Sequence, residues 1–255
     1  MNRAPALPGA VLVGRAGREI PRMLSDDRSH ALGHLLSRPT ATPAGDARPL
    51  VRGRRQRLGL GGRRDGFLFV PTGYDPAVPA PLVLLLHGAG ADAADLLPVF
   101  QPAAERAGCV VAAVDSRGVT WDSLTRGFGP DVEFVDRALA WTFERCAVDA
   151  TRVAVAGFSD GASYALSLGI TNGELLTHIM AFSPGFVAPA AQHGAPRLFV
   201  AHGRHDDVLP IDPCSRRIVP ALRRAGYDVC YREFDGYHSV PQPVVGEAME
   251  WFLEE

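Results

Sequence analysis

The chain of 255 residues is long enough for one sizeable α/β domain and too short for two large ones. Hydrophobic residues make up 47% of it and the mean hydropathy is +0.03, which is typical of a soluble globular protein. No apolar run approaches the roughly 20 residues that a membrane-spanning helix needs. The formal net charge of −2 indicates no particular polyanionic partner.

The first 55 residues differ in character from the rest. They contain Pro, Gly, Ala and Arg without sustained periodicity, apart from a possible short helix near Glu19–Leu36. We expect residues 1–55 to form an amino-terminal extension that is partly disordered, with binding of this basic arm to an acidic surface or to nucleic acid as the alternative. The start lacks the charged and apolar segments of a signal peptide, so a cytoplasmic protein is expected.

From residue 56 onward, short apolar runs alternate with helix-like patterns, which predicts one domain over 56–255. The predicted strands are Arg57–Leu60, Gly66–Val70, Leu82–Leu86, Val110–Val114, Arg152–Ala156, His178–Phe182, Arg197–Ala201 and Asp228–Phe234. The predicted helices are Ala93–Ala107, Pro130–Cys146, Gly161–Ile170, Asp212–Ala225 and Val244–Leu253. This alternation predicts a mostly parallel, twisted sheet of about eight strands with helices on both faces. In such sheets, ligands bind beyond the carboxyl ends of the strands.

A serine between two glycines occupies one of the predicted strand-to-helix turns. The motif Gly157-Phe158-Ser159-Asp160-Gly161 follows a buried strand and precedes a helix. That context is the one a nucleophile elbow requires, because the strained turn needs small residues on both sides. Ser159 is therefore the candidate nucleophile.

A hydroxyl nucleophile needs a histidine base, and the histidine needs a carboxylate to orient it. In this architecture the chain order is serine, acid, histidine. His238 lies in a loop just past the final predicted strand, and Asp206 follows the preceding strand. Asp207 is the direct rival of Asp206; the spacing His-Gly-x-x-Asp-x-Val favours Asp206 but leaves both open.

Acyl transfer also needs N–H donors aimed at the developing oxyanion. The segment His87–Gly90 follows the strand Leu82–Leu86, which suits one donor, and the N–H of Asp160 would be the other. Both positions lie at the carboxyl ends of predicted strands.

These motifs together resemble those of the α/β-hydrolase superfamily, over about residues 58–254. The similarity is greatest to its carboxylesterase/lysophospholipase and polyhydroxybutyrate-depolymerase-like branch, and the motifs that carry it are Leu86-His-Gly-Ala-Gly90, Gly157-Phe-Ser-Asp-Gly161, His202-Gly-Arg-His-Asp206 and Gly236-Tyr-His238. The resemblance implies an α/β-hydrolase fold and assigns the first oxyanion N–H to Ala89. One departure is Asp160, where many relatives carry an uncharged residue. If its carboxylate pointed into the site, it would oppose the oxyanion.

Sequence features bear weakly on the substrate. The direct connection Ser183–Pro196 leaves no room for the helical cap that often enters the superfamily at this point, so an open cleft is expected. Trp121 and Phe158 are candidates to line an acyl pocket, and packing against the core is an equal alternative for both.

The resemblance implies a serine carboxylic-ester hydrolase that forms an acyl-enzyme and acts on short-to-medium acyl esters. A serine peptidase or thioesterase of the same fold is the alternative, and a non-catalytic binder of small ligands is disfavoured because all three triad candidates are present. We expect a small-molecule ester substrate, no cofactor, no metal, no nucleic-acid partner and no membrane association. The four cysteines show no C-x-x-C spacing and are expected to be buried thiols. The oligomeric state stays open.

Overall fold

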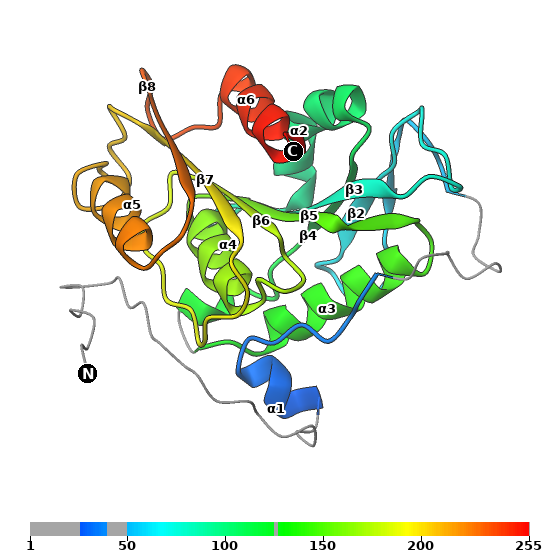
Figure 1. Ribbon diagram of the computed structural model, residues 1–255. Coiled ribbons are helices and arrows are strands. Elements are labelled where there is room, and N and C mark those ends of the chain that lie inside the picture. The colour runs from blue at the N-terminus through cyan, green and yellow to red at the C-terminus, as the bar shows by residue number, and fades with distance from the viewer. Residues whose placement is uncertain (1–25, 40–49, 125–126, 255) are drawn as a thin grey trace.

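The computed structural model describes residues 26–39, 50–124 and 127–254, and its centre is one eight-stranded sheet (Figure 1). The strands are β1 Arg55–Arg57, β2 Gly66–Phe69, β3 Ala80–Leu86, β4 Val110–Val114, β5 Val148–Phe158, β6 His178–Phe182, β7 Arg197–Gly203 and β8 Val229–Phe234. Their order in space is β1-β2-β4-β3-β5-β6-β7-β8. All neighbours from β4 to β8 are parallel, and only β1 and β2 join antiparallel. The predicted α/β-hydrolase architecture is confirmed.

Helices cover both faces of the sheet. Their bounds are α2 Ala93–Ala107, α3 Pro130–Phe143, α4 Asp160–Thr171, α5 Ser215–Arg224 and α6 Gln242–Leu253. Helices α2 and α6 pack on one face, while α3, α4 and α5 pack on the other (Figure 1). No helix replaces the direct connection between β6 and β7, so the carboxyl edge of the sheet carries no helical cap there.

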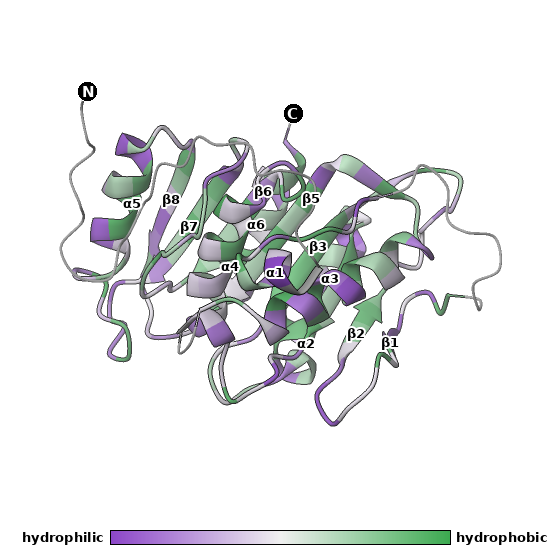
Figure 2. Cartoon of the chain, turned by 90° about the horizontal axis from the view of Figure 1, so that it is seen from below, coloured by the Kyte–Doolittle hydropathy of each residue, from purple (hydrophilic) through white to green (hydrophobic). Residues whose placement is uncertain are grey.

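Strands β3 and β4 are apolar along their whole length because both of their faces are covered (Figure 2). Along β3, Leu82, Leu84 and Leu86 belong to the core on the side of α3, α4 and α5, whereas Val83 and Leu85 belong to the core on the side of α2 and α6. All seven residues of β3 are buried. Because successive side chains of a strand point to opposite faces of the sheet, β3 contributes to both hydrophobic cores.

Several observed bounds differ from the predicted ones, and local contacts explain two of these differences. The first strand lies earlier than predicted, because the Asp65 carboxylate accepts hydrogen bonds from the N–H groups of Gly59 and Leu60 at 2.9 and 3.1 Å and turns this stretch into a loop. Helix α3 ends at Phe143 rather than Cys146. Beyond the C-cap Glu144, the N–H groups of Arg145 and Cys146 both bond to the Thr142 carbonyl, which closes the last turn.

Residues 26–39, part of the expected extension, lie against the domain. The segment begins with the short helix α1 Asp26–Ala31, which packs beside α3 (Figure 1). Leu35 is 1% exposed and belongs to the core on the α3 side. Its N–H donates to Asn172 Oδ1 at 2.8 Å, at the end of α4. The remainder of the expected extension, apart from residues 50–55, lies outside the described residues.

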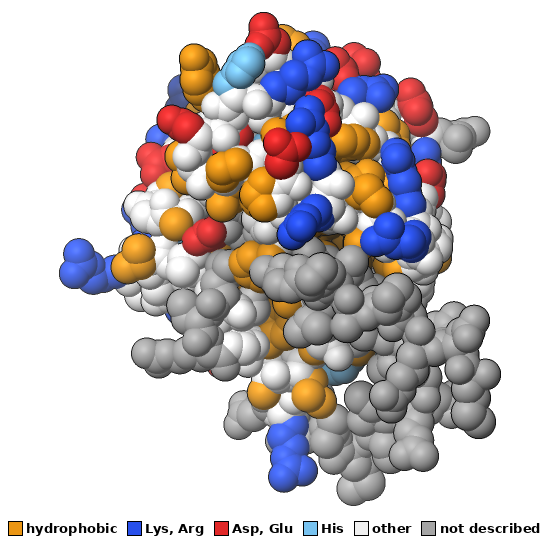
Figure 3. All heavy atoms as spheres, turned by 90° about the vertical axis from the view of Figure 1, so that its left-hand side faces the viewer, with side chains coloured by type: hydrophobic (Ala, Val, Ile, Leu, Met, Phe, Trp, Pro, Cys, Tyr) orange, Lys and Arg blue, Asp and Glu red, His pale blue; other side chains and the backbone are white. Residues whose placement is uncertain are grey.

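The face formed by α5 and β8 mixes charges of both signs (Figure 3). Arg216 pairs with Asp212 at 2.9 Å and with Glu233 at 2.7 Å on this face. Within the described ranges, no helix combines the length and the apolar character needed to cross a membrane.

Candidate active site

Ser159 occupies the turn between β5 and α4, at the carboxyl edge of the sheet. Its φ of +57° and ψ of −120° put this non-glycine residue in a rarely populated conformation. A Cβ on Gly157 would lie 2.1 Å from the Gly161 carbonyl oxygen, and a Cβ on Gly161 would lie 2.2 Å from the Leu86 carbonyl oxygen. Both flanking glycines are thus sterically required, because the turn brings α4 directly against β3 and β5.

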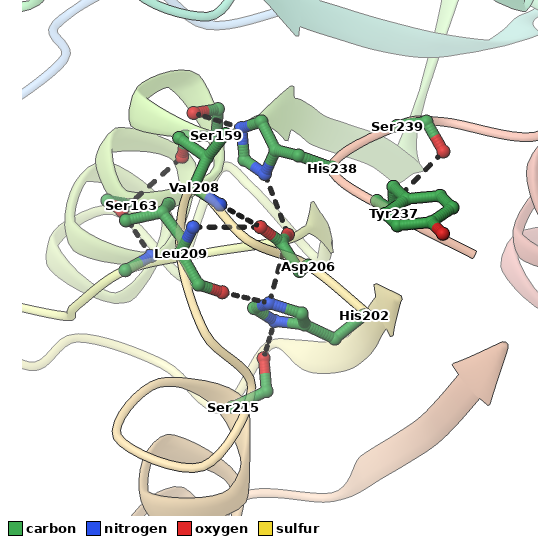
Figure 4. Close-up of polar contacts among 11 residues, drawn as sticks. Ser159, Ser163, His202, Asp206, Val208, Leu209, Ser215, Tyr237, His238 and Ser239 are labelled. Carbon is green, nitrogen blue, oxygen red and sulfur yellow. Dashed lines mark hydrogen bonds and ion pairs between the residues drawn. The ribbon is translucent and has the colours of Figure 1, made fainter. Parts of the chain in front are cut away.

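The three predicted triad residues meet at this edge although they are distant in sequence (Figure 4). His238 Nε2 lies 2.9 Å from Ser159 Oγ, and His238 Nδ1 lies 2.7 Å from Asp206 Oδ2. Asp207, the rival acid, is exposed. The structure therefore brings Asp206 and not Asp207 to the imidazole.

The environment of Asp206 favours its carboxylate form. Its second oxygen, Oδ1, accepts hydrogen bonds from the N–H groups of Val208 at 3.1 Å and Leu209 at 2.8 Å. Burial disfavours the charged form, but the hydrogen bonds from His238 and Leu209 outweigh it and hold the pKa of Asp206 below its usual value. A charged Asp206 keeps the proton of the neutral imidazole on Nδ1, which leaves Nε2 to accept from the Ser159 hydroxyl.

A second histidine, His202, supports the acid from below (Figure 4). Its Nε2–H donates to the Leu209 carbonyl at 2.8 Å and lies 3.2 Å from Asp206 Oδ2, while Nδ1 accepts from the Ser215 hydroxyl at 2.7 Å. Burial lowers the pKa of His202, so this ring is neutral near pH 7. The sequence motif contains His202 but assigns it no role. Its position four residues before Asp206 was the available signal.

The loop after β3 approaches the serine from the other side. A Cβ on Gly88 would lie 3.4 Å from Ser159 Cβ. Neither the Ala89 N–H nor the Asp160 N–H has a hydrogen-bond acceptor among the described residues. Two N–H groups are therefore available beside the serine, at the positions predicted for an oxyanion site.

The Asp160 carboxylate does not point into the site. Its Oδ2 accepts a hydrogen bond from Thr120 Oγ1 at 2.6 Å, and Asp160 does not line the cavity in front of Ser159. The negative charge that the sequence places beside the oxyanion position is thus held on the side of the loop that contains Thr120.

A cavity of about 440 Å³ opens in front of the serine and the histidine. It is lined by Gly88, Ala89, Ala91, Asp95, Leu96, Val99, Phe158, Ser159, Val208, His238 and Val240. Apolar side chains from α2 and from the loops after β7 and β8 form most of its wall. Phe158 lines the cavity as expected, and its ring centroid lies 4.7 Å from that of His238.

The expectation that Trp121 lines the pocket needs correction. Trp121 is 0% exposed and packs between Tyr164 and His87, with ring centroids 4.9 and 5.0 Å away. Its indole N–H donates to the His87 carbonyl at 2.8 Å. A buried indole settles where its N–H finds an acceptor, and here that acceptor belongs to the backbone beneath the cavity wall. Trp121 anchors the loop after β3 instead of contacting a ligand.

The structure offers no metal centre within its described residues, where no group of three or more His, Cys, Asp or Glu side chains is able to hold an ion. Cys109 and Cys146 are buried, and burial raises the pKa of each thiol to about 12. Neither thiol is a nucleophile near neutral pH.

Comparison with known proteins agrees with the geometry. Residues 132–254, which include Ser159, Asp206 and His238, match the Phospholipase/Carboxylesterase family. Feruloyl esterase C of Emericella nidulans is 25% identical over 157 residues, which are 58% of this chain. The match spans 57% of the length of that curated relative.

Solved structures share the fold at low sequence identity. The fluorophosphonate-binding serine hydrolase F of Staphylococcus aureus has a TM-score of 0.65 at 13% identity, covering 80% of this chain and 100% of that one. A Bacillus cereus carboxylesterase has a TM-score of 0.56 at 22% identity, covering 74% of this chain and 93% of that one. The sheet topology and these solved structures show the α/β-hydrolase fold, and residues 132–254 are similar to a family of phospholipases and carboxylesterases.

Proposed function

We propose that this chain is a serine carboxylic-ester hydrolase that works through an acyl-enzyme. Ser159 Oγ attacks the ester carbonyl while His238 Nε2 takes its proton. The tetrahedral intermediate collapses as His238 returns that proton to the leaving alcohol. Water, deprotonated by His238, then attacks the acyl-enzyme and releases the acid. The observation that carries the proposal is the run of contacts from Ser159 Oγ to His238 at 2.9 Å and on to Asp206 at 2.7 Å.

The remaining groups have supporting roles in this mechanism. Asp206 orients the imidazole and stabilises the imidazolium that forms, and the hydrogen bonds from His238 and from the Leu209 N–H keep it ionised. The N–H groups of Ala89 and Asp160 stabilise the oxyanion. Each such donor contributes roughly 2.7–4 kcal/mol to transition-state stabilisation in comparable enzymes.

The cavity supports neutral acyl esters as substrates. Leu96, Val99 and Val240 give it an apolar wall, and its volume of about 440 Å³ suits a small molecule. Among the described residues that line it, Asp95 is the only acidic one and there is no arginine. A carboxylate in the wall repels anionic substrates, so we propose uncharged short-to-medium acyl groups rather than acidic ones. Phe158 adds an aromatic surface, which supports including esters of aromatic acids such as ferulate.

The experiment that tests this function combines a covalent probe with a substrate series. A fluorophosphonate should label the wild-type chain at Ser159 and should not label Ser159→Ala. Ser163→Ala is the matched control, because Ser163 is a buried serine of the same helix that does not touch His238. p-Nitrophenyl esters of increasing chain length, methyl ferulate, a thioester and a peptide then rank the substrate classes. A folded wild-type chain that neither reacts with the probe nor cleaves any ester would contradict the proposal.

A further inference from the structure

The loop that carries Ala89 is held by a chain of hydrogen bonds that begins at Arg64. Arg64 lies in the turn between β1 and β2, outside every motif that points to the active site. Its guanidinium donates to the Ser116 carbonyl at 2.5 Å, to the Ala91 carbonyl at 2.8 Å and to His87 Nε2 at 3.1 Å. The Arg64 carbonyl in turn accepts from Arg117 Nη1 at 2.7 Å.

These contacts decide which nitrogen of His87 carries the proton. His87 Nε2 faces two groups that can only donate, namely the Arg64 guanidinium at 3.1 Å and the Ser116 backbone N–H at 3.0 Å. Nε2 must therefore be unprotonated, and the ring proton is on Nδ1. Burial, followed by the charge of Arg64, lowers the pKa of His87 and keeps the ring neutral.

The proton on Nδ1 orients one peptide plane. His87 Nδ1–H donates to the Gly88 carbonyl at 2.7 Å, and the Ala91 N–H donates to the same oxygen at 3.3 Å. The Gly88–Ala89 peptide is trans, because the described chain contains no cis peptide bond. In a planar trans peptide the C=O and the N–H point in opposite directions. Holding the Gly88 oxygen against His87 therefore aims the Ala89 N–H away from the ring and toward the cavity.

We propose that Arg64 is a positioning residue for ester hydrolysis, which aims the Ala89 N–H at the oxyanion by holding His87 in its Nδ1–H tautomer. The inference rests on the proposed function. Arg64 itself does not line the cavity and acts only through His87 and Ala91. The other tautomer would turn a ring N–H toward Arg64 and leave the Gly88 carbonyl without its histidine donor.

Arginine suits this role better than lysine. The acceptors of Arg64 belong to His87 and Ala91 in the loop after β3 and to Ser116 in the loop after β4, and the planar guanidinium reaches both loops at once. A lysine ammonium keeps the charge, but as a point donor it cannot span the same set. Arg64→Lys should consequently restore part of what Arg64→Ala loses.

The kinetic test compares wild type with Arg64→Ala, Arg64→Lys and Arg63→Ala. Arg63 is the matched control, since it is the exposed arginine next in the same turn. With p-nitrophenyl acetate, Arg64→Ala should lower kcat by about 10- to 100-fold with KM within about threefold, because a misaimed donor is lost only in the transition state. The affinity for a trifluoromethyl ketone, which forms a tetrahedral adduct on serine, should fall by the same factor. Arg64→Lys should be intermediate, and Arg63→Ala should match wild type.

A spectroscopic measurement distinguishes a role of Arg64 in orienting the Ala89 N–H from a merely structural role. ¹⁵N NMR of histidine-labelled protein, assigned with a His87→Gln variant, should show His87 as the Nδ1–H tautomer in wild type and as a mixture in Arg64→Ala. An Nε2–H tautomer in wild type would overturn the inference even if the Arg64→Ala variant did not fold. A kcat for Arg64→Ala within about twofold of wild type would also overturn the inference. A wild-type chain that binds no fluorophosphonate would instead remove the proposed function itself.

Discussion

Two of the histidine–aspartate pairs among the described residues, His238–Asp206 and His30–Asp136, differ in what surrounds them. His238 Nδ1 lies 2.7 Å from Asp206, and its other nitrogen faces Ser159 Oγ at 2.9 Å in an open cavity. His30 Nε2 lies 3.1 Å from Asp136, but this pair lies where α1 meets α3 and does not border the cavity. The pairing of the two residue types is the same. Catalysis becomes possible only at His238–Asp206, where a nucleophile and a cavity for a substrate lie beside the pair.

The two carboxylates also bind different partners. Asp206 Oδ1 accepts from the N–H groups of Val208 and Leu209 in its own loop, which orients it for His238. Asp136 Oδ1 accepts from the N–H groups of Leu36 and Ser37, each at 2.8 Å, which are about 100 residues away in the chain. One aspartate holds an imidazole in position, and the other fastens the segment 26–39 to the domain.

The largest expected effect is on kcat, and it distinguishes the two histidine–aspartate pairs. Asp206→Asn should lower kcat for p-nitrophenyl acetate by about 10⁴-fold, because an amide stabilises neither the required tautomer nor the imidazolium. Asp136→Asn should leave kcat per folded molecule within about twofold of wild type, since Asp136 lies away from the cavity. Comparable losses of kcat in the two variants would contradict the division of roles.

The second prediction concerns stability, for which we expect Asp136 to be the important aspartate of the two. Asp136→Ala should lower the free energy of unfolding by about 3–4 kcal/mol, because it leaves the N–H groups of Leu36 and Ser37 and the His30 imidazole without their shared carboxylate. Guanidinium chloride unfolding measures this. Asp75→Ala is the control, since the Asp75 carboxylate accepts a single exposed bond within its own turn. An Asp136→Ala variant as stable as the control would show that the segment is not held by this carboxylate.

A third histidine, which has no acid, extends the comparison to pH. His178 packs edge-on against Trp251 and Phe252, and its Nε2 has no hydrogen-bond partner among the described residues. Burial lowers the pKa of His178 to about 4. Between pH 6.5 and 4 the unfolded chain takes up a proton that the folded chain refuses, so stability should fall by about 2–3 kcal/mol as the pH falls through this window.

The control for this effect is His178→Phe, which keeps an aromatic ring without a titrating group. Its unfolding free energy should fall less than that of wild type over the same pH range. Parallel curves for the two proteins would mean that His178 is protonated in the folded chain.

The smallest expected effect tests the support beneath Asp206. Ser215→Ala removes the hydroxyl that bonds His202 Nδ1 at 2.7 Å, and so loosens the ring that approaches Asp206. We expect a loss of about 1 kcal/mol in stability and a decrease of a few-fold in kcat. Ser239→Ala, at an exposed loop position, should change neither. An unchanged kcat in Ser215→Ala would limit His202 to a packing role.

Most of the fold could be predicted from the sequence because its signals are local. The apolar runs of β3, β4 and β6 and the helix over Ala93–Ala107 are visible in short windows, and buried parallel strands need no further pattern. The bounds of β1 and α3 differ from the predicted ones because of a few local hydrogen bonds. The Asp65 carboxylate that ends β1 accepts two of these bonds, and no periodicity encodes it.

The candidate site likewise contains residues that the local sequence predicts and residues that it does not. The elbow at Ser159 and the order of Ser159, Asp206 and His238 were visible in the sequence, since a strand-to-helix turn leaves a spacing signature. The roles of Trp121, His202 and Arg64 were not. They follow from hydrogen bonds between segments that only folding brings together.

The sequence by itself determined that this chain forms a parallel α/β sheet with a serine at a strand-to-helix turn, because these properties depend on residues within one short stretch. Only the tertiary structure decided that Asp206 and not Asp207 meets His238, that Trp121 is buried, and that Asp136 holds the segment before the sheet. The spacing in the sequence favours Asp206 but leaves its neighbour Asp207 open. The two aspartates become different when the loop directs one toward the imidazole and the other toward water.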